Sequence, residues 1–179
     1  MTPDEVLDFW FDPENQPFWF KKSVTFDESV RDRLGEAHEA AAAGRLEAWR
    51  ETPEGALALV ILLDQVPRNI HRDTPRAFAT DPAALAVARA AVEAGFDGDL
   101  ERDQKLFLYL PFEHSEDLAD QERSIALFSA MGSARHTDYA VRHRDIIARF
   151  GRFPHRNTIL NRPSTPQEAE FLTKPGSSF

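Results

Sequence analysis

Three histidines are the residues of this chain best suited to proton transfer. His114 lies in an acidic segment, and His143 and His155 lie in a basic one. An imidazole titrates near neutral pH, so it can both accept and release a proton. Asp117 follows His114 closely enough for its carboxylate to orient the ring. We predict that any catalysis is acid–base chemistry, with His114 and His155 as proton carriers and Asp117 or Asp64 as the carboxylate that orients a histidine.

The chain becomes basic near its C-terminal end, although its net charge is −9. Residues 136–162 contain six arginines and only two aspartates. Several of these arginines recur at helical or turn spacing, and the forked guanidinium group suits phosphate or carboxylate. A local basic patch in an acidic protein therefore predicts a small-anion pocket. Its predicted ligand-binding residues are His143, Arg149, Arg152, Arg156 and Asn157.

Structural pairing is the competing interpretation of the same arginines. Residues 113–122 contain five acidic residues and no basic one. The simplest inference is that this acidic segment faces the basic one in the fold. The charged strings would then form a salt-bridge network, in which breaking a single buried pair is costly.

A further polar segment, Asp64 to Arg72, directly follows the most apolar run of the chain. We expect Pro67 to end the preceding helix, because proline disfavours helical geometry in the residue before it. Asp64 would then lie at the end of a buried helix, where a carboxylate needs a partner, and Arg68 is within local reach. A buried Asp64–Arg68 pair is one prediction. The alternative is that both residues belong to the ligand site.

A divalent-cation site is the weaker interpretation of the acidic segment. Asp117 and Gln121 are i, i+4 neighbours, and His114 would lie over the same turn. The spacing matches no known metal motif, and the chain has no cysteine, glycine-rich phosphate loop or dinucleotide fingerprint. We therefore predict no metal and no cofactor.

Composition excludes several classes of protein. The absence of cysteine excludes disulfides and thiolate metal sites. A sequence pI of about 5.1 argues against nucleic acid as a partner. The first residues are acidic and are not a signal peptide, and the apolar run Ala56–Leu63 is far shorter than the roughly 20 residues of a membrane span. We expect a cytoplasmic protein with no membrane partner.

Helical patterns run through the whole chain and predict an all-α fold. Thr2 to Glu5 and Thr165 to Glu168 read as capping boxes with proline at the first helical position. The run 56–63 is apolar all round and is predicted to be the central buried helix. Further helices are expected over Glu101–Tyr109, Ser115–Met131 and Thr137–Phe150, with Ser115 as an N-cap.

Helices alternating with short turns predict antiparallel helical hairpins stacked in a compact bundle or short solenoid. We expect residues 1–179 to form a single domain, with residues 172–179 as a loose C-terminal tail. The 14 phenylalanines would fill the core or form a homodimer interface.

Several strings resemble those of one bacterial family. They are Val6–Phe11, Leu62–Asn69, Phe107–Asp117, Arg149–Asn157 and Ser164–Leu172. The chain resembles, over essentially its whole length, the family known as domain of unknown function 924. The resemblance implies an all-α fold similar to tetratricopeptide-like hairpins, and it implies neither an activity nor catalytic residues.

Two functions follow from these patterns. The first is a pocket for a small anionic molecule, lined by arginine, histidine and aspartate and suited to acid–base catalysis. The second is a tetratricopeptide-like module that binds a peptide or protein on a concave helical face without catalysis. The sequence leaves open whether the protein is an enzyme.

Overall fold

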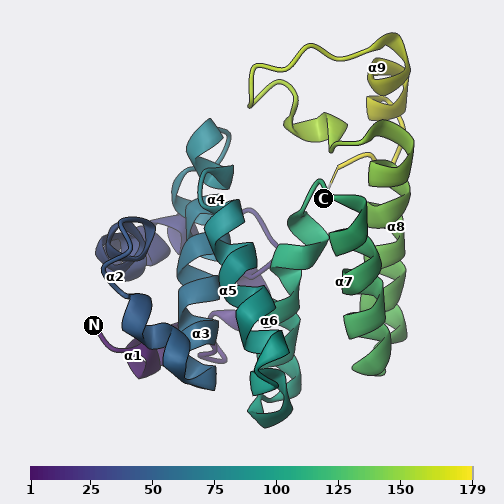
Figure 1. Ribbon diagram of the computed structural model, residues 1–179. Coiled ribbons are helices and arrows are strands. Elements are labelled where there is room, and N and C mark those ends of the chain that lie inside the picture. The colour runs from purple at the N-terminus through teal and green to yellow at the C-terminus, as the bar shows by residue number, and fades with distance from the viewer. Residues whose placement is uncertain (179) are drawn as a thin grey trace. The chain divides into compact units, whose positions relative to one another are not determined.

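The computed structural model describes residues 1–178, and these form only helices, turns and loops (Figure 1). No strand occurs in this range, so the predicted all-α class is confirmed. Phe179, the last residue of the predicted tail, lies outside the described residues. The α-helices are α1 (Pro3–Trp10), α2 (Val24–Ala42), α3 (Pro53–Val60), α4 (Val66–Ile70), α5 (Asp81–Glu93), α6 (Arg102–His114), α7 (Leu118–Ala130), α8 (Ala134–Phe150) and α9 (Pro166–Leu172).

The chain divides into two compact units. The first comprises residues 1–72 and 76–111, and the second comprises residues 73–75 and the chain from Phe112 onward. The boundary therefore falls within α6, after Pro111. The grouping of residues 1–179 into a single domain stays a prediction.

Side-chain caps begin several helices where the sequence predicts them. Thr2 and Thr165 each form a complete capping box, with Glu5 and Glu168 at the third helical position. Thr52 accepts a hydrogen bond from the Gly55 N–H at the start of α3. These caps satisfy N–H groups that have no partner within the helix.

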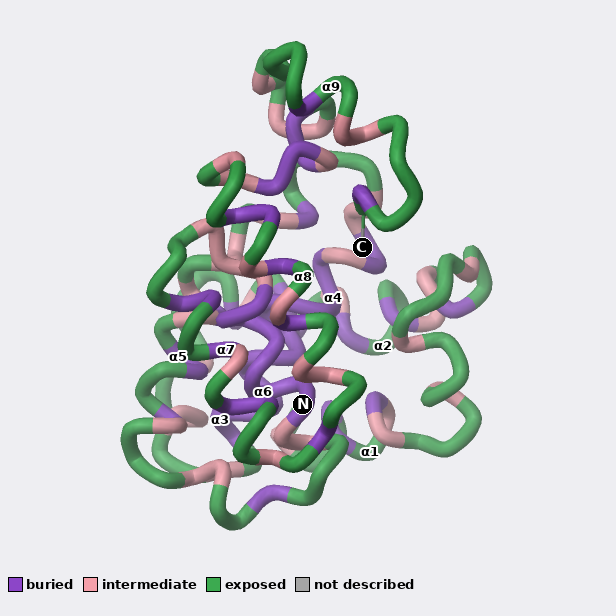
Figure 2. The backbone as a smooth tube through the Cα atoms, turned by 90° about the vertical axis from the view of Figure 1, so that its right-hand side faces the viewer, coloured by how far each residue is buried: buried purple, intermediate pink, exposed green. Residues whose placement is uncertain are grey.

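The core of the first unit is built on α3, which packs against α1 and α5. Every residue from Gly55 to Val60 is buried, and the burial continues to Pro67 (Figure 2). The predicted central buried helix is therefore confirmed. Residues Ile61–Gln65 form a π-helical turn that joins α3 to α4 without a break.

Pro67 does not end the helix, so that prediction is wrong. It occupies the first turn of α4, directly after the π turn. Proline cannot donate to the carbonyl four residues earlier, here that of Leu63. The Thr80 hydroxyl donates to this carbonyl instead, at 2.5 Å. The wider π turn and the hydroxyl together let the helix continue through the proline.

In the second unit, α7 and α8 pack side by side as an antiparallel hairpin (Figure 1). Their boundaries differ from the predicted ones. Asp117, not Ser115, is the N-cap of α7, and α6 continues through Pro111 to His114. The buried residues Ile146, Ile147 and Phe153 form a small core, against which Phe150 and Phe171 pack.

Candidate functional site

The residues predicted to form the site fall in both units. Asp64 and Arg68 belong to the first unit. The residues in the second unit are His114, Asp117, His143, Arg149, Arg152, His155, Arg156 and Asn157.

In the first unit, Arg68 binds two carboxylates. Its Nη1 lies 3.3 Å from Asp64 Oδ1, which confirms the predicted pair. Its guanidinium also forms a two-point contact with Asp81, at 2.7 and 2.9 Å. Asp81 opens α5, so the three residues tie the end of the central helix to α5. The sequence did not predict Asp81 as a partner of Arg68, because an aspartate in the first turn of a helix is already explained by that position.

The π turn presents its carbonyls to side chains. Such a turn breaks the regular hydrogen-bond ladder, and π turns occur frequently at functional sites. The donors to the carbonyls of residues 62 to 65 are, in order, His38, Thr80, Arg68 and Asn69. Side chains from three other parts of the first unit therefore fix the irregular turn.

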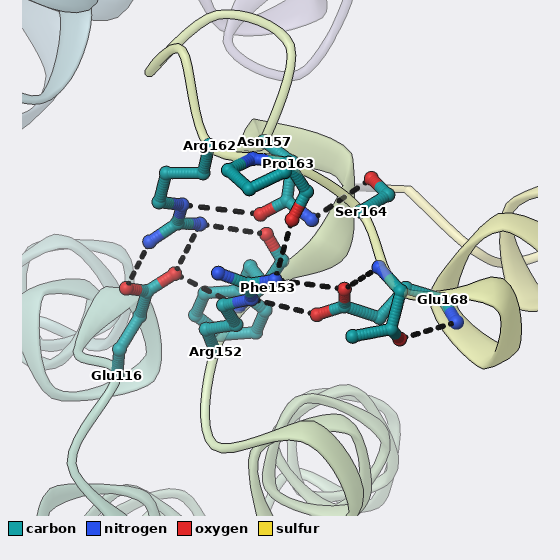
Figure 3. A network of polar contacts seen from close by, with 9 residues as sticks. Glu116, Arg152, Phe153, Asn157, Arg162, Pro163, Ser164 and Glu168 are labelled. Carbon is teal, nitrogen blue, oxygen red and sulfur yellow. Dashed lines mark hydrogen bonds and ion pairs between the residues drawn. The ribbon is translucent and has the colours of Figure 1, made fainter.

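In the second unit, Arg152 is held by a carboxylate. Its Nε and Nη2 donate to the two oxygens of Glu168, at 2.6 and 2.8 Å (Figure 3). Nη2 also donates to the Pro163 carbonyl at 2.9 Å. The Glu168 side chain is only 3% exposed. This geometry favours the structural interpretation of Arg152 over a ligand-binding one.

Arg162, which the sequence did not single out, forms a second two-point pair. Its guanidinium donates to both oxygens of Glu116, at 2.7 and 3.0 Å (Figure 3). Burial would raise the pKa of Glu116, but hydrogen bonds from Arg162 and from the Phe153 N–H hold it below its usual range. The expectation that residues 113–122 face the basic segment is therefore confirmed within this unit.

The side chains of Arg149 and Asn157 also contact other residues of the second unit. The Arg149 guanidinium lies 4.5 Å from the centre of the Phe150 ring and 5.8 Å from that of Phe171. Asn157 is buried, donates to the Ser164 hydroxyl and accepts from Arg162 Nε (Figure 3). Their assignment to a ligand site stays a prediction.

Two histidine rings and one guanidinium group lie around the ring of Phe153, which is fully buried. The rings of His143 and His155 each lie with their centres 5.6 Å from its centre. The Arg156 guanidinium lies 4.6 Å from the same centre, and its Nη2 donates to the His114 carbonyl at 3.0 Å. We call His114, His143, His155 and Arg156, with Phe153, the imidazole cluster.

Burial and positive neighbours keep two of these imidazoles neutral. Burial, together with the neighbouring His114, His155 and Arg156, lowers the pKa of His143 to about 3 against the opposing hydrogen bond to Tyr139. Burial and then Arg156 lower the pKa of His155 to about 4. His143 Nδ1 lies 2.9 Å from the Tyr139 carbonyl and 3.5 Å from Glu113 Oε1. The tautomer with the proton on Nδ1 leaves Nε2 as the basic nitrogen.

Asp117 and Gln121 serve the local fold. Asp117 accepts from the N–H groups of Ala119 and Asp120 and so caps α7. Gln121 Nε2 donates to carbonyls at the end of α6 and in the following turn, those of Phe112, Glu113 and Ser115. These contacts do not support Asp117 as the orienting group of His114. A shallow hollow of about 560 Å³ lies at the turn between α7 and α8, and its lining includes none of the predicted site residues.

Among the described residues, no helix is long and apolar enough to span a bilayer. The chain matches the model of the family "Bacterial protein of unknown function (DUF924)" over residues 6–176. A search of curated proteins finds no match. The chain is also similar to a solved structure, that of the protein of unknown function ATU0120 from Agrobacterium tumefaciens. The two share 44% sequence identity and a TM-score of 0.90, over 95% of this chain and 96% of that one.

Proposed function

Because the chain belongs to the DUF924 family of bacterial proteins of unknown function, we propose a function from its geometry: the second unit binds a small anion, a phosphate or a carboxylate, at the imidazole cluster. The observation that carries this proposal is the gathering of two imidazoles and one buried guanidinium around a single apolar ring, with the carbonyl of a third histidine, His114, accepting from that guanidinium. The cluster combines a fixed positive charge with nitrogen atoms that can take up a proton.

Arg156 supplies the charge. It is 7% exposed, and a guanidinium interacts more strongly with an anion where solvent screens it less. Stacking on Phe153 and the bond to the His114 carbonyl fix its plane. A guanidinium held in one plane matches the paired oxygens of a phosphate or carboxylate.

The imidazoles supply proton transfer. In the structure their low pKa values make His143 and His155 weak bases, because burial and Arg156 disfavour the imidazolium form. A bound anion would offset the positive field and raise both pKa values toward neutrality. Anion binding and proton uptake are then coupled, and an imidazole next to the bound anion becomes a general acid. His114 and His155 are only partly buried and are the rings that solvent can reach.

Calorimetry of the whole chain tests the proposal. Inorganic phosphate and citrate are titrated at pH 6 and pH 8 into the wild-type protein, Arg156→Gln and the control Arg149→Gln, whose guanidinium is exposed. We expect tighter binding at the lower pH and net uptake of up to about one proton, measured by comparing buffers of different ionisation enthalpy. Arg156→Gln should weaken binding at least about tenfold, which is the loss of one charge-assisted contact.

Two results would contradict the proposal. One is that neither phosphate nor citrate binds to the wild-type protein at millimolar concentration. The other is that Arg149→Gln and Arg156→Gln weaken binding equally, which would indicate a diffuse charge effect. Histidine ring signals in NMR spectra distinguish a folded, non-binding variant from an unfolded one.

A non-catalytic interaction module is the second candidate. It is favoured by exposed apolar side chains at the start of α2 and in the loop before it: Phe18 is 38% exposed, Phe20 64% and Val24 69%. A second copy of the chain is the partner that we propose. If the mass in solution is that of a dimer, and Phe20→Ser gives a monomer that still binds no anion, this function replaces the first.

A further inference from the structure

Two histidines and a glutamate meet in the first unit, in a place that the sequence analysis did not single out. His38 and Glu39 are neighbours on α2, and His71 is the residue that ends α4. Since α2 packs against α4, the three side chains converge. One ligand atom from each lies within 4.8 Å of the other two. We propose that His38, Glu39 and His71 bind a divalent transition metal of the zinc type, at a site independent of the anion site proposed above.

His38 is oriented as a metal ligand. Its side chain is buried, and its Nδ1 lies 2.8 Å from the Leu62 carbonyl. That carbonyl belongs to the π turn and accepts the ring proton, so Nδ1 is the protonated nitrogen and Nε2 carries the lone pair. Metal-binding histidines nearly always make such a second hydrogen bond, which fixes the tautomer and the ring plane.

The ring of His71 lies beside that of His38. Its centre lies 5.8 Å from that of His38, and the planes are inclined by 59°. The two rings are thus neighbours that do not stack.

Glu39 is the anionic ligand, and Arg76 competes for it. Arg76 Nη2 donates to Glu39 Oε1 at 2.6 Å, but the side chains of Arg76 and Glu39 are 61% and 55% exposed. An exposed pair of this kind contributes little free energy and is readily exchanged. A metal ion therefore needs only to displace a surface arginine to gain a carboxylate oxygen.

The ligand set selects the class of metal. Two imidazole nitrogens and one carboxylate oxygen form the three-residue set of many zinc sites, in which a water molecule completes the tetrahedron. Zinc bonds of about 2.0–2.1 Å place tetrahedral ligand atoms roughly 3.3 Å apart. Metal binding would therefore draw the ligand atoms, now within 4.8 Å of one another, closer together, chiefly through movement of the exposed Glu39 side chain.

Titration of the metal-free whole chain with Zn²⁺ tests the site, with calorimetry to measure affinity and stoichiometry. We expect one ion per chain with a micromolar or lower Kd. Glu39→Gln and His71→Ala should each weaken binding at least about tenfold, because losing even a residue that only orients a metal ligand costs roughly 10–100-fold. Since Glu39 is exposed, its variant keeps the fold. Arg76→Gln should tighten binding severalfold, because it removes the competing cation.

His136→Ala is the matched control, because it removes one histidine in the second unit. It should bind Zn²⁺ as the wild-type protein does. Co²⁺ provides a second probe, since tetrahedral coordination gives visible d–d bands that Glu39→Gln should abolish or shift. The proposal is overturned if the wild-type protein binds no Zn²⁺, or if Glu39→Gln and His71→Ala bind it with unchanged affinity. It is also overturned if His136→Ala weakens binding as much as they do.

Discussion

Replacing Glu168 by glutamine removes one charge from the Arg152–Glu168 pair and almost nothing else. Glutamine has nearly the same volume, and its side-chain oxygen can still accept from the Thr165 N–H, a bond that is 2.7 Å long in the structure. Capping boxes accept either residue at this position. Arg152 keeps its bond to the Pro163 carbonyl but loses the two-point carboxylate contact. The substitution therefore isolates the electrostatic contribution of the pair.

The expected loss follows from the pKa of Glu168. The hydrogen bond from Arg152 is the main reason that this pKa is lowered to about 2, from a usual value of 4.5. One pKa unit corresponds to about 1.4 kcal/mol, so the full depression sets an upper limit of roughly 3 kcal/mol. The Arg152 side chain is 27% exposed. Because solvent screens the pair, we expect Glu168→Gln to lower the free energy of unfolding by about 2 kcal/mol at pH 7.

The pH dependence has a definite sign. A carboxylate with a lowered pKa stabilises the folded state above its unfolded pKa, and this contribution is lost as the pH falls from about 4.5 toward 2. The difference between wild type and Glu168→Gln should therefore be full above pH 5 and vanish near pH 2. Glu170→Gln is the control, because the Glu170–Lys174 pair is largely exposed and should contribute little to the free energy of unfolding.

Amide hydrogen exchange in α8 and α9 is the appropriate assay. The three tryptophans, Trp10, Trp19 and Trp49, all lie in the first unit, so their fluorescence does not report on the second. A loss below about 0.5 kcal/mol at pH 7, or a difference from wild type that stays constant down to pH 2, would refute the reasoning.

Four smaller predictions concern the helices themselves. Thr80→Val removes the donor to the Leu63 carbonyl. It should lower the free energy of unfolding by about 1–3 kcal/mol, measured by thermal unfolding. Gln121→Leu leaves carbonyls around the end of α6 without this donor and should cost about 2–3 kcal/mol in urea unfolding; no measurable loss would mean that water replaces the amide. Gly151 ends α8 with a φ of 68°. Gly151→Ala should therefore lower the free energy of unfolding by about 1 kcal/mol. Gly35→Ala, inside α2 with open space around the added Cβ, should instead stabilise by roughly 0.5–1 kcal/mol.

Local signals predicted the fold well. The caps at Thr2, Thr52 and Thr165 act through residues within three positions, so the sequence contains every group that matters. The start of α7 was misplaced because Ser115 and Asp117 are both competent caps. Ser115 instead donates its hydroxyl to Asp120, which leaves Asp117 to cap the helix. Two adjacent candidates of this kind cannot be separated by pattern alone.

The charge pairs were predicted as a class but not individually. Facing acidic and basic segments were expected, and Glu116 and Arg162 realise that expectation across 46 positions. Which arginine meets which carboxylate depends on the path of the chain after α8, and no local rule fixes that path. Arg152 was chosen as a ligand residue because its partner, Glu168, looked like an ordinary capping-box residue. Glu168 both completes the capping box with Thr165 and pairs with Arg152.

The sequence did not predict the π turn at Ile61–Gln65, and the reason is different. A helix shows its phase through the alternation of apolar and polar faces, and an extra residue in one turn shifts that phase. Residues 56–63 are apolar on every side, so no phase exists to be shifted. Only a neighbour reveals the turn, because His38 donates to the Leu62 carbonyl, which in a regular helix would accept from the Val66 N–H. The same irregularity that lets the helix pass through Pro67 thus also orients the ring of His38, and the proposed metal site depends on it.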